Sequence, residues 1–282
     1  MAGNFEYLRA VGLGYYIPRE SPLHQRDPRA KLLTAFFLLL SITLTQNPAG
    51  LLLGLVTAMV GFIVARLSPK YAPKGLITPL PFLLLIALIQ IILHKPLPSS
   101  QIWFQLSFLK VYDTALLTAG MLILRFAALV LIISLSTSVI STLEIIYGLE
   151  SLLKPLNKIG LPVDAVVMTV QIMLRFLPLL ALRMEQISKS QASRGAEWDA
   201  PRGGPINRAK LFLPLIVPLF LGSLQQAERT TTAMLARGYG VSKQRSSPYE
   251  YRFNSGDVFF LLLAAILTGV ILIPVDYFIK LV

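Results

Sequence analysis

Several apolar runs in the 282-residue sequence approach or exceed the length that crosses a lipid bilayer. A spanning helix needs about 20 apolar residues, because the hydrocarbon core is about 30 Å thick. Hydrophobic residues make up 55% of the sequence and charged residues only 14%, whereas about a quarter of a soluble domain is charged. The alternating pattern of an outer-membrane barrel is absent from the sequence. The sequence therefore predicts an all-α integral membrane protein.

Five transmembrane helices are expected, together with a cytoplasmic-side domain of long amphipathic helices. The first two spans are short and are separated by an uncharged turn, so we expect them to form a tight hairpin. The expected spans are 32–45, 51–65, 76–93, 114–139 and 257–279. The chain then divides into an N-terminal segment (1–31), four transmembrane helices (32–140), a central domain (141–254) and a C-terminal transmembrane helix (255–282).

The net charge of +12 is explained by membrane topology before nucleic acid is considered. Cytoplasmic loops of membrane proteins are enriched in Lys and Arg. Residues 141–254 carry 14 basic and 8 acidic residues, whereas residues 95–113 carry two Lys and one Asp. We therefore expect a multi-pass protein of the plasma membrane. Its N-terminus and central domain would be cytoplasmic, and its C-terminus would lie outside.

Three helices are expected in the central domain. Residues 143–156 have apolar side chains at helical spacing and are too short and too charged to cross, which indicates a helix along the interface. Residues 163–194 and 207–237 each begin apolar and Pro-interrupted and become polar later. An ordinary sixth span over 163–194 is the alternative. Three polar residues in its apolar half favour a helix that leaves the membrane: Thr169, Gln171 and Arg175.

The two long helices carry a repeat with an offset of 43 residues. The repeat places Glu185 on Glu228, Arg194 on Arg237, and Gly195 on Gly238. A Gly just past a helix permits the left-handed conformation that ends it, and an Arg in the last turn suits the helix dipole. That ordinary interpretation is sufficient for Arg202-Gly203, which lies in a linker. The repeated pair differs because each closes a long helix, and this predicts two docking tips for a partner that is itself two-fold.

The repeated glutamates precede their arginines by nine residues, which is about 900° of helix rotation. Each Glu therefore lies opposite its own Arg and cannot pair with it. We expect the glutamates to hold helices together and the arginines to reach outward. A guanidinium at a rigid helix tip is suited to carboxylates or carbonyls in a groove of a partner.

Catalytic and metal-binding patterns are missing from the sequence. It has no cysteine, no Walker A motif and only two histidines, His24 and His94. A membrane-bound enzyme is therefore not favoured. Arg125 is the clearest intramembrane charge, and such a group is a functional candidate by default. We favour a structural role for it, bonded to backbone or to hydroxyls such as Ser134 or Thr118.

An ordered set of motifs resembles the transmembrane T component (EcfT/CbiQ-like family) of energy-coupling factor (ECF) type ABC transporters. Ser193 is one departure, because the family typically has Ala before this Arg; Ser is also small. The resemblance covers nearly the whole chain and rests on Gly14-Tyr15-Tyr16-Ile17-Pro18, Ser21-Pro22-Leu23-His24, Asp27-Pro28-Arg29, Gly148-Leu149-Glu150-Ser151-Leu152-Leu153-Lys154-Pro155-Leu156, Arg175-Phe176-Leu177-Pro178 and the two Arg-Gly ends.

The resemblance implies a non-catalytic subunit of an ATP-driven importer of vitamins or micronutrients. Two ABC-type ATPases would dock on the tips and would bind the ATP, so this chain would hold no cofactor and no metal. A substrate-binding S component would lie on apolar helix faces, and membrane lipid but no nucleic acid would be a further partner. The implied docking residues are Ser193, Arg194, Gly195, Ala236, Arg237 and Gly238, and the implied S-component cradle is Ile145, Leu149, Leu152, Leu153, Phe176 and Phe220.

A self-contained channel or secondary transporter is the alternative function. Secondary transporters place polar sites at the bilayer midplane within inverted repeats of spans. This sequence has few intramembrane charges, and its repeat lies in the basic central domain. The coupling subunit is therefore favoured.

Overall fold

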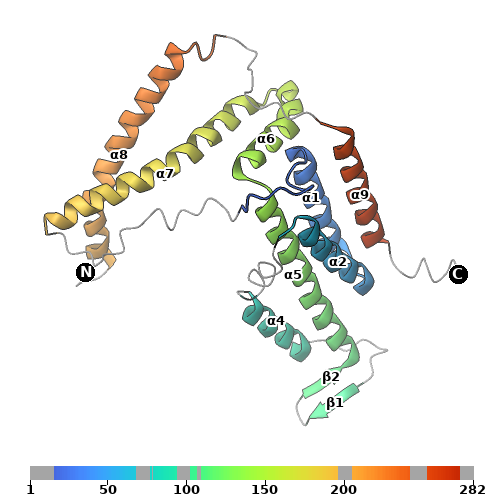
Figure 1. Ribbon diagram of the computed structural model, residues 1–282. Coiled ribbons are helices and arrows are strands. Elements are labelled where there is room, and N and C mark those ends of the chain that lie inside the picture. Colours follow the sequence, from blue (N-terminus) through green and yellow to red (C-terminus); the bar gives the residue numbers. More distant parts are fainter. Residues whose placement is uncertain are drawn as a thin grey trace. The chain divides into compact units, whose positions relative to one another are not determined.

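The computed structural model describes residues 16–67, 77, 79–93, 102–106, 109–195, 205–241 and 253–273. The chain divides into two compact units. The bundle comprises Gly14–Leu153 and Tyr251–Val282, and the crossing-helix unit comprises Met1–Leu13 and Lys154–Glu250. The described residues are mainly helical (Figure 1).

The bundle is built around α1 (Pro28–Leu44) and α5 (Asp113–Val139). Helix α1 packs against α5, α6 and α9, while α5 also packs against α2 and α4. A short antiparallel hairpin, β1 (Ile102–Leu106) with β2 (Leu109–Tyr112), precedes α5 where a loop was expected. The remaining helices of the bundle are α2 (Pro48–Val64), α4 (Leu80–Leu93), α6 (Thr142–Leu153) and α9 (Ser255–Leu272).

The first two helices begin three or four residues earlier than expected, because proline starts both of them. Helix α1 begins at Pro28, where the Asp27 carboxylate accepts a hydrogen bond from the backbone N–H of Arg29 at 2.8 Å. Helix α2 begins at Pro48. Proline suits the first helical position, since its missing N–H would have had no helical partner there. The expected turn-rich segment 1–31 therefore already contains the first turn of α1.

The core of the bundle lies between α1, α2 and α5, where small residues allow close approach. Ile42 and Leu51 are fully buried, with Ala58 and Ala128 in the same cluster. A Cβ added to Gly54 would lie 2.9 Å from the Ile42 side chain. Small residues at helix contacts are typical of membrane bundles, which gain little from burying one apolar surface against another in lipid.

Apolar side chains also cover the outside of the helices, as a lipid-facing surface requires. Ile63, Phe82 and Phe259 are more than 60% exposed. By length and composition, α5, α7 (Val163–Ser193) and α9 are long enough to cross a membrane, and α2 and α4 are shorter apolar helices. Because α7 is among the helices long enough to cross, the structure is compatible with either interpretation of residues 163–194, a sixth span or a helix that leaves the membrane. The end of the expected last span, 274–279, lies outside the described residues.

The expected helix over residues 143–156 divides into two parts. Helix α6 ends at Leu153, and a 3₁₀ helix, η2 (Lys154–Ile159), follows. Pro155 explains the break, because it has no N–H to donate and disfavours helical geometry at the residue before it. The change from α6 to η2 also marks the boundary between the two compact units.

The crossing-helix unit consists mainly of α7 and α8 (Pro205–Ala236), which cross each other (Figure 1). The side chain of Asn157 in η2 fixes the start of α7. Its carbonyl accepts from the backbone N–H of Val163 at 2.9 Å, and its amide donates to Asp164 at 3.1 Å. Both long helices continue through internal prolines at Pro178, Pro214 and Pro218.

Candidate functional site

The two Arg-Gly dipeptides end α7 and α8 in the same way. Gly195 has φ +86° and Gly238 has φ +76°, which is the left-handed region expected for each. The N–H of Gly195 donates to the Ala192 carbonyl at 3.0 Å, and the N–H of Gly238 donates to the Leu235 carbonyl at 2.9 Å. A non-glycine residue would be strained at either position. The repeated glycines therefore set where each helix stops.

The tips themselves are exposed. Ser193, Arg194 and Gly195 are exposed at the end of α7, as are Ala236, Arg237 and Gly238 at the end of α8. Among the described residues, neither tip guanidinium has a hydrogen-bond or ion-pair partner. The two ends lie apart on either side of the crossing (Figure 1). The unit thus presents two separate free cations, each at the end of a regular helix.

The repeated glutamates do not connect the long helices as expected. Glu185 forms an ion pair with Lys189 on its own helix at 2.6 Å, and Glu228 is exposed. The connection is made by Arg183 instead. Its Nη1 donates to the Gly222 carbonyl at 2.7 Å, and its Nη2 donates to the Gln226 Oε1 at 3.0 Å. Neither acceptor of Arg183 is charged, so a pattern of opposite charges in the sequence could not indicate this contact.

The crossing brings equivalent positions of the repeat together. Arg183 and Gln226 are 43 residues apart, the same offset that relates the two Arg-Gly ends. Gln186 and Arg229 have the same separation and line one cavity with them. One contact of the crossing therefore joins two positions that the sequence repeat relates.

The expected cradle residues are divided between the two units. Ile145, Leu149, Leu152 and Leu153 lie on α6 in the bundle, and Phe176 and Phe220 lie on α7 and α8. Phe220 is 64% exposed and Leu149 48%, which leaves both faces available to an apolar partner.

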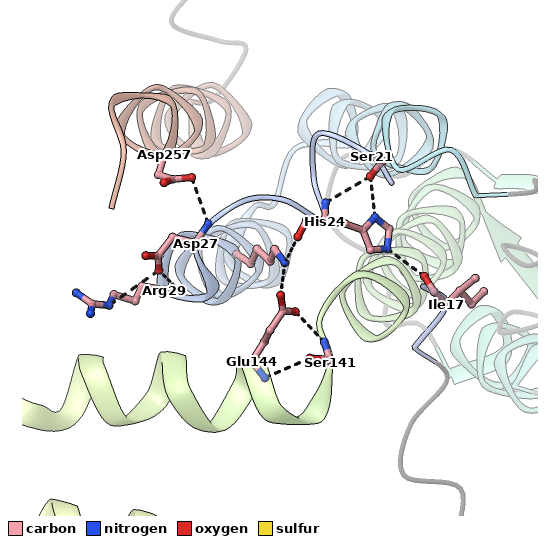
Figure 2. A network of polar contacts seen from close by, with 9 residues as sticks. Ile17, Ser21, His24, Asp27, Arg29, Ser141, Glu144 and Asp257 are labelled. Carbon is pink, nitrogen blue, oxygen red and sulfur yellow. Dashed lines mark hydrogen bonds and ion pairs between the residues drawn. The ribbon is translucent and has the colours of Figure 1, made fainter. Parts of the chain in front are cut away.

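A buried ion pair fixes the start of α6 to α1 (Figure 2). Lys31 Nζ donates to Glu144 Oε1 at 2.8 Å and to the His24 carbonyl at 2.7 Å. The Lys31 side chain is 2% exposed and that of Glu144 13%. Glu144 also accepts from the Ser141 N–H at 3.0 Å, while the Ser141 hydroxyl accepts from the Glu144 N–H at 3.2 Å. This reciprocal capping box is visible in the sequence as Ser-x-x-Glu, but its link to Lys31 is not.

The segment before α1 is ordered by further polar contacts (Figure 2). The His24 ring lies within hydrogen-bond distance of the Ser21 hydroxyl, at 2.7 Å, and of the Ile17 carbonyl, at 3.2 Å. Burial lowers the pKa of His24, and nearby Lys31 lowers it further. The Asp27 N–H donates to the Asp257 carboxylate at 3.2 Å, which connects the segment to α9. His94 lies outside the described residues. No metal-binding cluster is found among the residues that the structure describes.

Arg125 donates from Nη2 to the backbone carbonyl of Thr45, at the end of α1. The last carbonyls of a helix have no helical partner and carry partial negative charge, so a guanidinium suits this position. The Thr118 hydroxyl bonds carbonyls of its own helix instead. The partner of Arg125 is thus a main-chain group that no side-chain pattern could indicate.

The apolar outer surfaces and the crossing pair define an all-α integral membrane protein. Residues 19–248 match the family described as cobalt transport protein, CbiQ, and the chain belongs to this family. It is similar to proteins named energy-coupling factor transporter transmembrane protein EcfT. Identity is 36% to that of Bacillus subtilis (strain 168), covering 90% of this chain and 96% of the relative. Identity is 32% to that of Ruminiclostridium cellulolyticum, covering 96% of this chain and 100% of the relative.

The family is a membrane component of transporters and not a catalytic subunit. This agrees with the expectation from the motifs and places the chain among the transmembrane components of energy-coupling factor transporters.

Proposed function

We propose that the chain is the transmembrane scaffold subunit of an ECF-type ABC importer. It would couple ATP hydrolysis by two cytoplasmic ATPases to reorientation of a substrate-binding S component, and so support uptake of a vitamin or micronutrient. ATP would be bound by the partner ATPases and not by this chain. The N-terminus and the central domain would lie on the cytoplasmic side, as their basic residues indicate.

One observation carries this proposal: two equivalent, unpaired arginine tips are connected through a single crossing. A dimer of ATPases offers two equivalent grooves, and two equivalent tips fit them one each. A bidentate guanidinium would bind a carboxylate in each groove strongly and with defined orientation. The exposed apolar faces on α6, α7 and α8 would hold the S component within the membrane.

The test is co-purification of the double variant Arg194→Glu, Arg237→Glu in mild detergent. Each reversed charge would face the carboxylates proposed for the groove, and the loss of one partner from such a buried pair costs about 2–5 kcal/mol. We expect the ATPases to be lost and the small hydrophobic S component to be retained.

Arg202→Glu is the matched control, because it changes the Arg-Gly of the linker, which lies outside the described residues. It should leave the complex intact. Retention of both ATPases and of full transport by the double variant would overturn the proposal. Transport by the chain alone in vesicles, without ATPases, would instead support the self-contained channel or secondary transporter.

A further inference from the structure

A cavity of about 150 Å³ lies at the crossing of α7 and α8. Two cations and three amides line it: Arg183 and Gln186 from α7, and Gln225, Gln226 and Arg229 from α8. No carboxylate is among its lining residues. Such a lining is rich in hydrogen-bond donors and positive charge, and this composition favours an anion.

The two arginines keep most of their donors for a ligand. Arg183 uses two N–H groups, to the Gly222 carbonyl and to Gln226, and a guanidinium has five. Arg229 is exposed and has no hydrogen-bond or ion-pair partner within the described part of the chain. Two like charges on one cavity repel each other. A bound anion between them would remove that repulsion and use the remaining donors.

The cavity lies where both helices change from apolar to polar. On α7 the exposed side chains of Leu179 and Leu182 directly precede Arg183. On α8 the exposed side chains of Phe220, Leu221 and Leu224 precede Gln225. An apolar-to-polar change along a membrane helix marks the level of the lipid headgroups. A free inorganic anion would make no contact with the adjacent apolar surface. A phospholipid would contact both the polar cavity and the apolar surface beside it.

We propose that this cavity binds the phosphate of an anionic phospholipid. The guanidinium of Arg183, fixed by Gly222 and Gln226, and that of Arg229 would hold the phosphate from opposite helices. The acyl chains would lie along the exposed leucines of α7 and α8. Anionic lipids are concentrated in the cytoplasmic leaflet, and guanidinium–phosphate pairs are bidentate. The lipid would then connect the two long helices at their crossing, whatever partners occupy their tips.

Native mass spectrometry of the full chain, purified and delipidated in detergent, tests this proposal. Phosphatidylglycerol is the probe, and phosphatidylcholine is the zwitterionic comparison. We expect one phosphatidylglycerol to be retained per chain, in preference to phosphatidylcholine. Arg229→Gln should weaken retention about tenfold, because it removes a charge-assisted hydrogen bond. Gln225→Glu keeps the shape of the side chain and places a negative charge in the cavity, so it should weaken retention as well.

Arg194→Gln is the matched control, because it removes the same charge from the end of α7 and lies outside the cavity; lipid retention should not change. Equal retention by the wild type and both cavity variants would overturn the proposal. So would displacement of the lipid by an equal concentration of inorganic phosphate, which would identify a site for free anions. ATPase co-purification with Arg229→Gln tests the proposed function independently of lipid binding.

Discussion

The bundle and the crossing-helix unit are stabilised to different degrees by burial. In the most apolar stretch of α5, 22% of residues are buried within the protein, against 6% for α7. The bundle adds the buried Lys31–Glu144 ion pair and the capping contacts around it. Helices α7 and α8 are connected mainly at their crossing, through Arg183. The bundle is therefore held together by burial and buried polar contacts, whereas the two long helices leave most of their surfaces for lipid and partners.

The largest expected effect is on the bundle. Glu144→Ala would leave Lys31 charged and buried without its partner, which costs about 3–5 kcal/mol. The midpoint of thermal unfolding in detergent should fall markedly. Glu150→Ala, on the same helix, is the control and should leave the midpoint almost unchanged. A similar small loss for both variants would show that the bundle does not depend on the ion pair.

Close packing of α6 on α1 gives the next effect. A Cβ at Gly148 would lie 3.2 Å from the backbone carbonyl of Pro28 and against the side chain of Leu32. Gly148→Val should therefore force the helices apart and lower stability by about 1–3 kcal/mol. Gly120 lies in α5 with nothing within 4 Å of a Cβ, so Gly120→Val is the control. Equal midpoints for the two variants would contradict this packing.

A smaller effect is expected in the crossing-helix unit, and it should leave the bundle unchanged. Arg183→Met removes both hydrogen bonds at the crossing. The sequence has no cysteine, so spin labels at Ser193→Cys and Ala236→Cys would be unique. Their distance distribution should broaden in Arg183→Met, with little change in the unfolding midpoint. Arg175→Met on the same helix is the control and should keep the distance distribution narrow. A broad distribution in Arg175→Met would show that the loss of a positive charge, and not the loss of the two hydrogen bonds, causes the broadening.

The smallest effect is the response of the bundle to pH. The pKa of His24 is lowered by burial and by Lys31, so the folded bundle favours the neutral ring. The unfolded chain then binds more protons as the pH falls below about 6.5, and stability falls with it down to the lowered folded value. Above that range the contribution of His24 is fully present. In His24→Gln the unfolding midpoint should change less between pH 7 and pH 5 than in the wild type. The same dependence of the midpoint on pH in both proteins would show that other groups cause the response.

Helix positions in the crossing-helix unit were largely predictable from the sequence. Residues 163–194 and 207–237 differ by one or two residues from the observed α7 and α8, because Gly195 and Gly238 end them and apolar spacing defines them. The starts of α1 and α2 were missed by three or four residues, because Pro28 and Pro48 were assigned to turns when they occupy the first helical position.

The contacts that hold the site together were less predictable than its helices. Arg183 bonds a backbone carbonyl and a neutral amide, and Arg125 bonds the carbonyl of Thr45. Main-chain acceptors are present at every position, so no residue pattern indicates which one is used. Lys31 and Glu144 have opposite charges but are 113 residues apart, and only the packing of α6 on α1 brings them together.

Beyond the contact at the crossing, the C-terminal arms of the two long helices are equal in length. Arg194 follows Arg183 by 11 residues, and Arg237 follows Gln226 by 11 residues. Each arm is therefore about 16 Å long and about three helical turns. Equal displacements at the two tips then rotate both helices by the same angle about the contact. A single residue inserted into one arm would lengthen it by about 1.5 Å and turn its arginine by about 100°, so the two arms would no longer match in length or in the direction of their arginines.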